Sequence, residues 1–295
     1  MSVADDFIRF NNAYNIDRDT IASISYRYRR ITRQLNSDFW NTASDTAHSL
    51  YAGSYGRDTA ARGLSDLDIG FVLPVAFYHK YNGYQYNGQS ALLQAVKTSI
   101  RKTYKTSDSF GDGQVVVVKF TDNITFEVLP VFEHVDGESW IYPNTNHGGS
   151  WKTCNPRAEI AAVKKRNSET NKNLKRLCRM MRAWRDYNNV PMSGMLIDTL
   201  AYQFIANWVH RDKSYLYHDY MARDFFAYLA ALDTNQSYWR APGSGSNVAK
   251  KGHFHWKARV AYNQSVQAIL HDQNGQVWSR RQMWRKIFGP AFPAA

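Results

Sequence analysis

One stretch, DLDIGFVLP from Asp66 to Pro74, constrains the fold more than any other part of the chain. The branched and aromatic residues after Asp68 predict a buried strand, which Pro74 ends. Side chains two apart on a strand point to the same face, so Asp66 and Asp68 emerge side by side, about 7 Å apart, while Leu67 turns the other way. Two like charges held together favour a cation between them. The alternative for an isolated Asp-x-Asp is a solvated turn.

A further acid lies in the clearest strand pair, QVVVVKFTDNITFEVLPVFE from Gln114 to Glu133. Glu127 stands between apolar neighbours in the second strand, where an acid is either solvated at a sheet edge or part of a metal site. With Asp66 and Asp68 it gives three carboxylates on neighbouring strands of one sheet. Such hard oxygen ligands suit Mg²⁺, which also takes phosphate ligands. Two such ions can activate an attacking hydroxyl and stabilise a leaving pyrophosphate.

A Gly-Ser turn lies upstream of the paired acids. The stretch LYAGS predicts a short strand that ends in a turn at Gly53 and Ser54. Glycine allows a close backbone approach, and the serine hydroxyl and N–H can meet the β- and γ-phosphate oxygens of a nucleotide. The turn therefore fits the other end of a metal-bound triphosphate.

The composition limits the class of protein. With 295 residues, 44% hydrophobic and 15% aromatic, the chain can bury a sizeable core, and no apolar run approaches the length of a membrane span. The N-terminus predicts no signal peptide, and the spacing of Cys154 and Cys178 argues against a zinc site, so we expect a cytoplasmic protein. The net charge of +12 favours polyanionic partners: nucleic acid, nucleoside triphosphates or an anionic membrane.

The chain divides into two parts by pattern. Residues 4–50 and Gly88–Lys105 predict helices in a mixed first half that also holds the strands. After Trp140 a stretch rich in Gly, Asn and Pro predicts loop, and from Arg157 onward the chain is predicted helical with one loop, Ala241–Asn247. We therefore expect a sheet-containing domain at 1–150 and a helical domain at 151–295.

The motifs of the first half resemble the DNA polymerase beta-like nucleotidyltransferase superfamily. Its signature is a hydrophobic-Gly-Ser turn, an acid-x-acid strand and a third acid on a later strand. The resemblance implies an α+β fold, in which a mixed sheet packs on a C-terminal helical bundle. It also implies that Asp66, Asp68 and Glu127 bind the metal ions and that Gly53 and Ser54 form the phosphate turn.

The second half narrows the resemblance to synthases of cyclic oligonucleotides, related to animal cyclic GMP-AMP synthase and bacterial dinucleotide cyclases. In LKRLCRMMRAWRDYNNVPMSGMLIDTLAYQFI, Arg182 takes a position where that family usually has Lys, and Ser193 that of a serine touching the terminal phosphate. The alternatives are a solvated helix face for Arg182 and an N-cap for Ser193, which can coexist with phosphate contact. Trp184 is expected in the core. The C-terminal QMWRKIFGPAFP also looks like that family's closing stretch, at Trp284, Phe288 and Gly289.

Asn167 is a candidate for binding the base of the nucleotide. It lies fifteen residues before Arg182, about four helical turns, so one continuous helix would put both residues on nearly the same face, about 22 Å apart. The amide can donate and accept at once, as the edge of a base requires. A helix N-cap or an exposed polar residue is the alternative.

The resemblance implies a metal-dependent enzyme that joins nucleoside triphosphates into a cyclic di- or oligonucleotide and releases pyrophosphate. It would use two Mg²⁺ ions, which Mn²⁺ can replace. In bacteria such enzymes resemble the signal-generating half of anti-phage defence systems, in which a separate effector responds to the product. No membrane partner is implied, and nucleic acid is compatible with the charge but not required. Two alternatives remain open: an RNA or tRNA tailing nucleotidyltransferase, and a catalytically silent nucleic-acid sensor.

Overall fold

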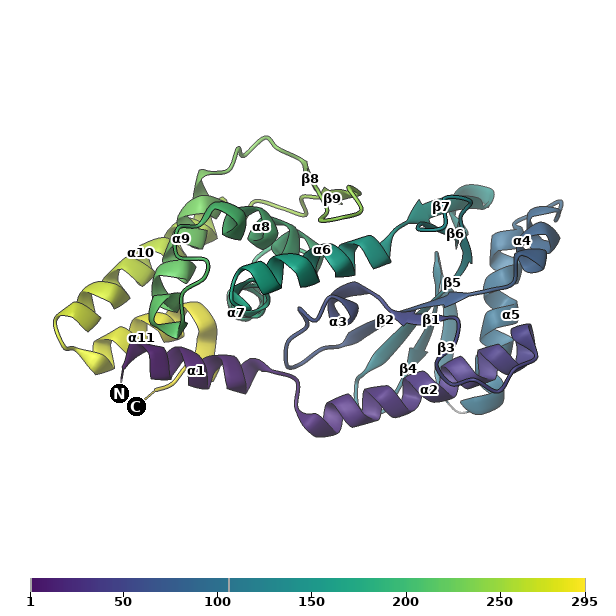
Figure 1. The fold of residues 1–295 in the computed structure, drawn as a ribbon, viewed down its shortest axis with the longest axis horizontal. Coiled ribbons are helices and arrows are strands. Elements are labelled where there is room, and N and C mark those ends of the chain that lie inside the picture. Colours follow the sequence, from purple (N-terminus) through teal and green to yellow (C-terminus); the bar gives the residue numbers. More distant parts are fainter. Residues whose placement is uncertain (1, 106, 295) are drawn as a thin grey trace. The chain divides into compact units, whose positions relative to one another are not determined.

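The computed structural model describes residues 2–105 and 107–294 (Figure 1). Contacts divide the chain into two compact units. One, which we call the sheet unit, comprises Ile16–Arg57 and Gly63–Ile160. The other, the helical unit, comprises the described residues of Met1–Asn15, Asp58–Arg62 and Ala161–Ala295. The short segment Asp58–Arg62 thus belongs to the helical unit, although in sequence it lies between the Gly-Ser turn and the paired acids.

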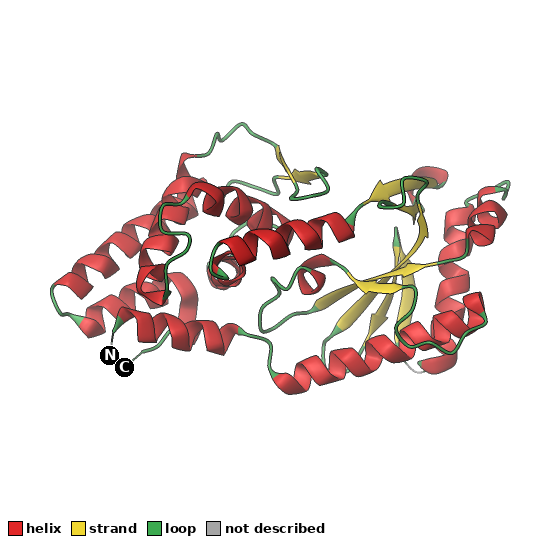
Figure 2. Cartoon of the chain, viewed as in Figure 1, coloured by secondary structure: helices red, strands yellow, loops and turns green. Residues whose placement is uncertain are grey.

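The sheet unit consists of a mixed β-sheet and the helices that pack on it (Figure 2). Its helices are α2 (Arg18–Trp40), α3 (Gly53–Gly56), α4 (Val75–Asn82) and α5 (Gly88–Thr103), with a short 3-10 turn, η1 (Asn146–Gly148). Its strands are β1 (Ser49–Tyr51), β2 (Asp66–Val72), β3 (Asp108–Asp112), β4 (Val115–Lys119), β5 (Thr125–Glu133), β6 (Trp140–Asn144) and β7 (Ser150–Cys154).

A parallel pair lies at the centre of this sheet. The strands follow the order β1-β2-β5-β4-β3, and β6 pairs with β5 and carries β7. Strands β2 and β5 run parallel, whereas the other neighbours run antiparallel. A parallel pair needs a long crossover connection, and here it contains α4, α5, β3 and β4.

Helices α2 and α5 cover one face of the sheet. Their apolar residues form one core with Leu67, Ile69 and Phe71 of β2 and with Phe126 and Val128 of β5, all buried. Side chains alternate between faces along a strand, so the residues between these point to the opposite face. The three predicted acids are among them.

The helical unit is built almost entirely of helices (Figure 2). They are α1 (Val3–Tyr14), α6 (Pro156–Glu169, which begins in the sheet unit), α7 (Asn173–Tyr187), α8 (Gly194–Asn207), α9 (His218–Ala231), α10 (His255–Gln273) and α11 (Val277–Phe288). Two 3-10 turns, η2 (Tyr215–Tyr217) and η3 (Gly289–Ala291), and a small hairpin, β8 (Tyr238–Arg240) and β9 (Asn247–Ala249), complete it.

Charges and aromatic rings hold α1 on α11, at the other end of the chain. The Asp6 carboxylate is fully buried and accepts from Arg280 at 2.6 Å and from Arg281 at 2.9 Å and 3.0 Å. Beside it the rings of Phe7 and Trp284 meet edge to face, with centroids 5.2 Å apart. A buried carboxylate is stable only with such partners, so these contacts fix the first helix to the C-terminal core.

The predicted α+β fold is confirmed, and two local predictions are wrong. The stretch after Trp140, predicted as loop, contains β6 and β7, because its backbone pairs with the end of β5. The loop Ala241–Asn247 is present, but it joins the two short strands of a hairpin, whereas the sequence predicts the second half apart from this loop to be helical. The predicted boundary near residue 150 stays a prediction, while the contacts divide the chain within α6, at Ile160. No helix in the described ranges has both the length and the apolar character of a membrane span.

Candidate active site

The paired acids open β2, and the third acid lies beside them on β5. In the parallel register Asp68 is opposite Glu127, and Asp66 is opposite Thr125. Asp66 is exposed, Asp68 and Glu127 are partly buried, and Leu67 between the aspartates is fully buried. The predicted alternation is confirmed, and the three carboxylates lie on one face of the sheet, opposite α2 and α5.

Burial and the charges of neighbouring acids raise the pKa values of Asp68 and Glu127. Burial raises the pKa of Asp68, the positive charge of Arg57 opposes this, and the charge of Asp66 adds to it. Burial also raises the pKa of Glu127, and the charges of Asp68, Asp66 and Asp112 raise it further. Negative charge gathered in this way is relieved by a cation, which favours the ionised forms.

The Gly-Ser turn lies directly against Asp68. Gly53 and Ser54 begin α3, and the Ala52 N–H before them donates to the Asp68 carbonyl oxygen over 2.9 Å. Gly53 has a φ of +55°, and a Cβ at this position would lie 1.7 Å from Asp68 Oδ2. Both the backbone conformation and the lack of space therefore require glycine. The turn predicted for phosphate and an acid predicted for metal are immediate neighbours.

Sequence analysis did not identify Arg57, the residue that follows α3. It is 6% exposed, and its Nη1 donates to Glu159 Oε2 over 3.1 Å. Its charge favours the ionised form of Asp68. No local sequence signal marks this residue, because Glu159 lies 102 positions further along the chain.

Trp140 closes the far end of the acid-bearing face. A Cβ at Gly70, on the same face of β2 as Asp66 and Asp68, would lie 2.2 Å from the Trp140 ring. The indole therefore packs on the strand where the side chain is missing. This confines the polar part of the face to the first residues of β2.

The donor set suits a hard divalent cation. Three carboxylates share one face, and two of them have raised pKa values because they are crowded and partly buried. Among the described residues, no three His, Cys, Asp or Glu side chains already form a ligand cluster around one point. Metal binding would therefore require the carboxylates of Asp66, Asp68 and Glu127 to turn toward a common ion, as hard oxygen ligands of Mg²⁺ do.

In the helical unit, Arg182 is buried in an ion pair. It is 4% exposed, and its guanidinium donates to Asp198 Oδ1 over 2.7 Å, to the Thr59 hydroxyl and to the Gly194 carbonyl. The alternative of a solvated helix face is wrong, because α7 packs this side into the core. Phosphate contact by Arg182 stays a prediction, and it would require the buried pair with Asp198 to open.

Ser193 caps the helix that follows it. Its hydroxyl accepts the N–H of Leu196 over 3.1 Å at the start of α8. The N-cap alternative is thus confirmed, and phosphate contact stays a prediction. Trp184 is 1% exposed, as expected for a core residue.

Comparison with known proteins gives the family. Residues 1–167, more than half of the chain, match the model of the Second Messenger Oligonucleotide or Dinucleotide Synthetase domain. The chain belongs to this family. A probable cyclic nucleotide synthase of Bacillus cereus (strain VD146) is 24% identical over 215 residues, which cover 69% of this chain and 63% of that protein. The chain thus matches less than two thirds of the length of this relative.

Solved structures share the fold of this synthetase-family chain. CdnC of Escherichia coli MS115-1, in complex with HORMA-deltaN, aligns with a TM-score of 0.73 and 15% identity over 98% of both chains. The same CdnC with ATP aligns with a TM-score of 0.70 and 16% identity, again over 98% of both chains. At this level of identity the likeness shows the fold.

The family match ends at Asn167. The predicted helical geometry between this residue and Arg182 is wrong. Asn167 and Arg182 do not share a continuous helix, because α6 ends at Glu169 and the chain turns through positive φ at Asn171 and Lys172. Asn167 Oδ1 accepts the N–H of Lys175 over 3.1 Å, at the start of α7. Asn167 is not the N-cap of α7, which is Lys172, although its side chain accepts a hydrogen bond from the first turn of that helix. Contact with a base stays a prediction without that helical support.

Proposed function

We propose that this chain joins nucleoside triphosphates into a cyclic di- or oligonucleotide and releases pyrophosphate. The observation that carries the proposal is the register of β2 and β5, which sets Asp68 beside Glu127 on the face that also holds Asp66, with Gly53 against Asp68. Family membership supports the reaction class. Three acids on one sheet face can supply the oxygen ligands for the two ions that an in-line displacement at phosphorus uses.

Asp66, Asp68 and Glu127 would hold two Mg²⁺ ions, which Mn²⁺ can replace, and Gly53 and Ser54 would meet the phosphates. When bound, such ions acidify an attacking hydroxyl and neutralise charge on the triphosphate. We assign Glu127 to help deprotonate the ribose hydroxyl, mostly through the bound metal, because its carboxylate lies opposite Asp68 on the acid-bearing face.

The hydroxyl oxygen then forms a bond to the α-phosphorus of the donor, and the bond from that phosphorus to the bridging oxygen breaks. The electron pair of the broken bond leaves with pyrophosphate. A second transfer of the same kind, with the linear product as donor and acceptor, closes the ring. Arg57 supports this chemistry indirectly, because its charge favours the ionised form of Asp68 against the effect of burial.

The proposed substrates are nucleoside triphosphates, supported by the structure of CdnC with ATP. We further propose a place in bacterial anti-phage signalling, in which the product activates a separate effector protein. This part rests on the motifs and on the family, whose name describes second-messenger synthesis.

The test is incubation of the purified protein with pairs of labelled triphosphates and Mg²⁺, followed by phosphatase digestion. A small product that resists phosphatase supports the proposal, and it should disappear with EDTA and return with Mn²⁺. A ladder on added RNA would identify a tailing enzyme. The matched control is the Asp66→Asn/Asp68→Asn protein, and equal turnover by both proteins would contradict the proposed metal site.

A further inference from the structure

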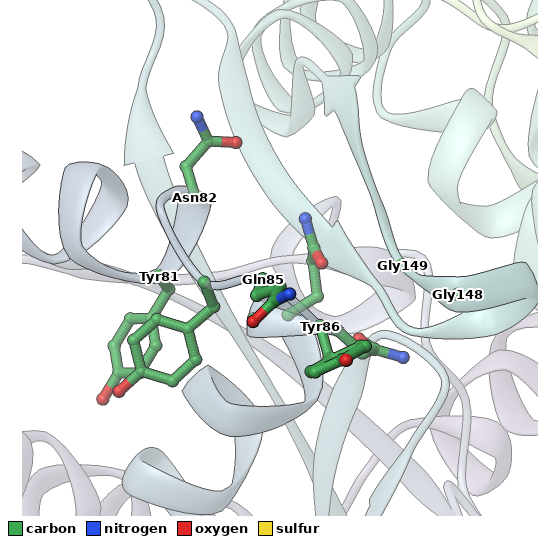
Figure 3. A pocket seen from close by; sticks show the side chains of 10 residues that line it. Tyr81, Asn82, Gln85, Tyr86, Gly148 and Gly149 are labelled. Carbon is green, nitrogen blue, oxygen red and sulfur yellow. The ribbon is translucent and has the colours of Figure 1, made fainter.

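A cavity of about 470 Å³ lies in the sheet unit where α4 ends and α5 begins (Figure 3). One wall is formed by the last residues of α4 and the loop that leads to α5. Gly148 and Gly149, just before β7, form the other wall. None of the predicted catalytic or nucleotide-binding residues lines it. Its volume is that of a site for a small organic ligand.

The lining described by the structure carries no charge. It consists of three tyrosines, two asparagines, two glutamines and three glycines. Without a cation in the lining, the cavity does not suit a phosphate group. Without a carboxylate, it does not suit an amine or a metal ion. The chemistry present is neutral hydrogen bonding and the faces of aromatic rings.

Two of the amides already hold the walls in place. Asn87 Oδ1 accepts the N–H of Ser90 at the start of α5, and Asn87 Nδ2 donates to the Thr145 carbonyl over 2.9 Å. Asn82 Oδ1 accepts the indole N–H of Trp151 over 2.9 Å. These bonds tie the loop to the strand side of the cavity, so its shape is formed before any ligand arrives.

Gln89 adds a side-chain amide that is not used to hold the walls. It is 8% exposed, lines the cavity and makes no side-chain hydrogen bond to any residue in the described ranges. Gly149 gives it room, because a Cβ there would lie 2.3 Å from Gln89 Oε1. Its amide can pair with a ligand that both donates and accepts a hydrogen bond.

The tyrosines supply stacking surfaces beside this amide. Tyr86 is 81% exposed and Tyr84 is 47% exposed, so both rings are open to a ligand. Tyr84 is supported from behind by Tyr81, with ring centroids 5.3 Å apart. Figure 3 shows Tyr81, Gln85 and Tyr86 on the side of the cavity facing Gly148 and Gly149.

We propose that this cavity binds a neutral planar heterocycle of the nucleobase class, presented as a nucleoside. A side-chain amide pairs with an adjacent donor and acceptor on the edge of a base. A base also stacks on tyrosine at little cost in sequence specificity. Proline-rich peptides dock on aromatic grooves as well. Such peptides offer mainly acceptors, since proline has no N–H, and would leave the carbonyl of Gln89 unsatisfied.

The test measures binding of adenosine, guanosine, cytidine and uridine, without triphosphate or metal, by calorimetry and ligand-observed NMR. We expect saturable binding of at least one nucleoside to the wild-type protein. Gln89→Leu should weaken it by about three- to tenfold, and Tyr86→Ala by about tenfold or more. The matched controls, Gln94→Leu on the same helix and Tyr26→Ala on α2, lie outside the cavity and should bind like wild type.

The inference does not depend on catalysis, and its failure is separable from failure of the proposed function. The Asp66→Asn/Asp68→Asn protein should bind nucleosides normally, and loss of binding there would place the ligand at the acids and overturn the inference. Absence of nucleoside binding to wild type overturns it, as does binding that neither cavity variant weakens. A proline-rich peptide that binds in place of nucleosides, and is lost with the same variants, also overturns it. Unchanged thermal unfolding of Gln89→Leu shows that the variant is folded.

Discussion

Asp68 and Glu127 lie opposite each other in the parallel register of β2 and β5, although two helices and two strands separate them in sequence. The pairing places both carboxylates on the face of the sheet that α2 and α5 leave uncovered. The pKa of each is raised by burial, and the charge of Asp68 also raises that of Glu127. Without a cation, the protein therefore holds carboxylates whose ionisation opposes folding.

Replacing Asp66 and Asp68 together with Asn should abolish synthesis and leave the fold intact. The change removes two of the three proposed metal ligands, and it also removes like charges from one sheet face. We therefore expect the variant to unfold at an equal or higher temperature than wild type in EDTA. Circular dichroism and product analysis measure the two effects.

Addition of Mg²⁺ provides the control for this variant. A ligand that binds only the folded state raises its stability, so Mg²⁺ should raise the unfolding temperature of wild type. The double variant should show little change. An equal Mg²⁺ effect in both proteins would mean that the ion binds elsewhere.

Gly53→Ala should destabilise the sheet unit and impair synthesis. The substitution forces a side chain into left-handed backbone and onto the Asp68 carboxylate. We expect a loss of about 3 kcal/mol or more from strain and overlap together. Gly63→Ala is the matched control, because Gly63 has a φ of +81° and open space around it, so only the strain of about 1–2 kcal/mol applies. Equal losses in urea unfolding would show that the contact with Asp68 is unimportant.

Ser54→Ala should weaken the use of triphosphate with little effect on folding. If the hydroxyl meets phosphate oxygens, its loss removes one hydrogen bond to a charged group, which corresponds to about a tenfold rise in apparent KM. Ser37→Ala on the exposed side of α2 serves as the control. An unchanged KM would mean that the turn is only structural.

The elements around the acids could be predicted from sequence because their signals are local. Asp66 and Asp68 precede an apolar run that ends at a proline, and Glu127 interrupts another such run. Period-two alternation then fixes which side chains share a face. The strands β6 and β7 could not be predicted in this way, because their sequence is rich in glycine, asparagine and proline, which are typical of loops. They form strands because β6 pairs with the end of β5 and β7 pairs with β6.

The roles of several residues could not be predicted from local sequence, because they depend on partners that are distant in sequence. Arg182 is buried because Asp198 and Thr59 surround it, and neither partner is near it in sequence. The predicted position of Asn167 depends on an unbroken helix, which the positive φ of Lys172 interrupts, a conformation that lysine rarely adopts. The buried position of Arg57 depends on its ion pair with Glu159, which lies 102 positions away, so the sequence alone does not mark it. Tertiary partners, rather than local pattern, decide the roles of these residues.

Arg182→Met should destabilise the helical unit, because it leaves the carboxylate of Asp198 buried without its cation. Breaking a buried pair from one side costs about 3–5 kcal/mol. Lys175→Met, which breaks a more exposed pair with Asp58, is the control and should cost at most about 1 kcal/mol. Urea unfolding measures both. Loss of triphosphate binding by a fully stable Arg182→Met protein would instead support the phosphate role.

Asp219 in α9 should make the stability of the helical unit depend on pH. It is 4% exposed, and burial raises its pKa to about 6 from an ordinary value of 3.8, with a smaller contribution from the charge of Asp272. Between these two pKa values, Asp219 keeps its proton in the folded protein, whereas the same carboxyl has already lost it in the unfolded chain. The resulting stabilisation is fully present below about pH 4 and is lost as the pH rises to about 6, by about 3 kcal/mol in total.

Asp219→Asn removes this dependence, because an amide cannot ionise and its oxygen can still accept the Tyr220 N–H. The variant should be more stable than wild type at pH 7 by up to about 3 kcal/mol, and the two proteins should converge as the pH falls toward 4. Glu138→Gln, an exposed acid in the sheet unit, is the control and should follow the wild-type profile. Urea unfolding at half-unit steps from pH 4 to 7 measures the difference. A constant offset between Asp219→Asn and wild type across that range would show that packing, rather than ionisation of Asp219, separates them.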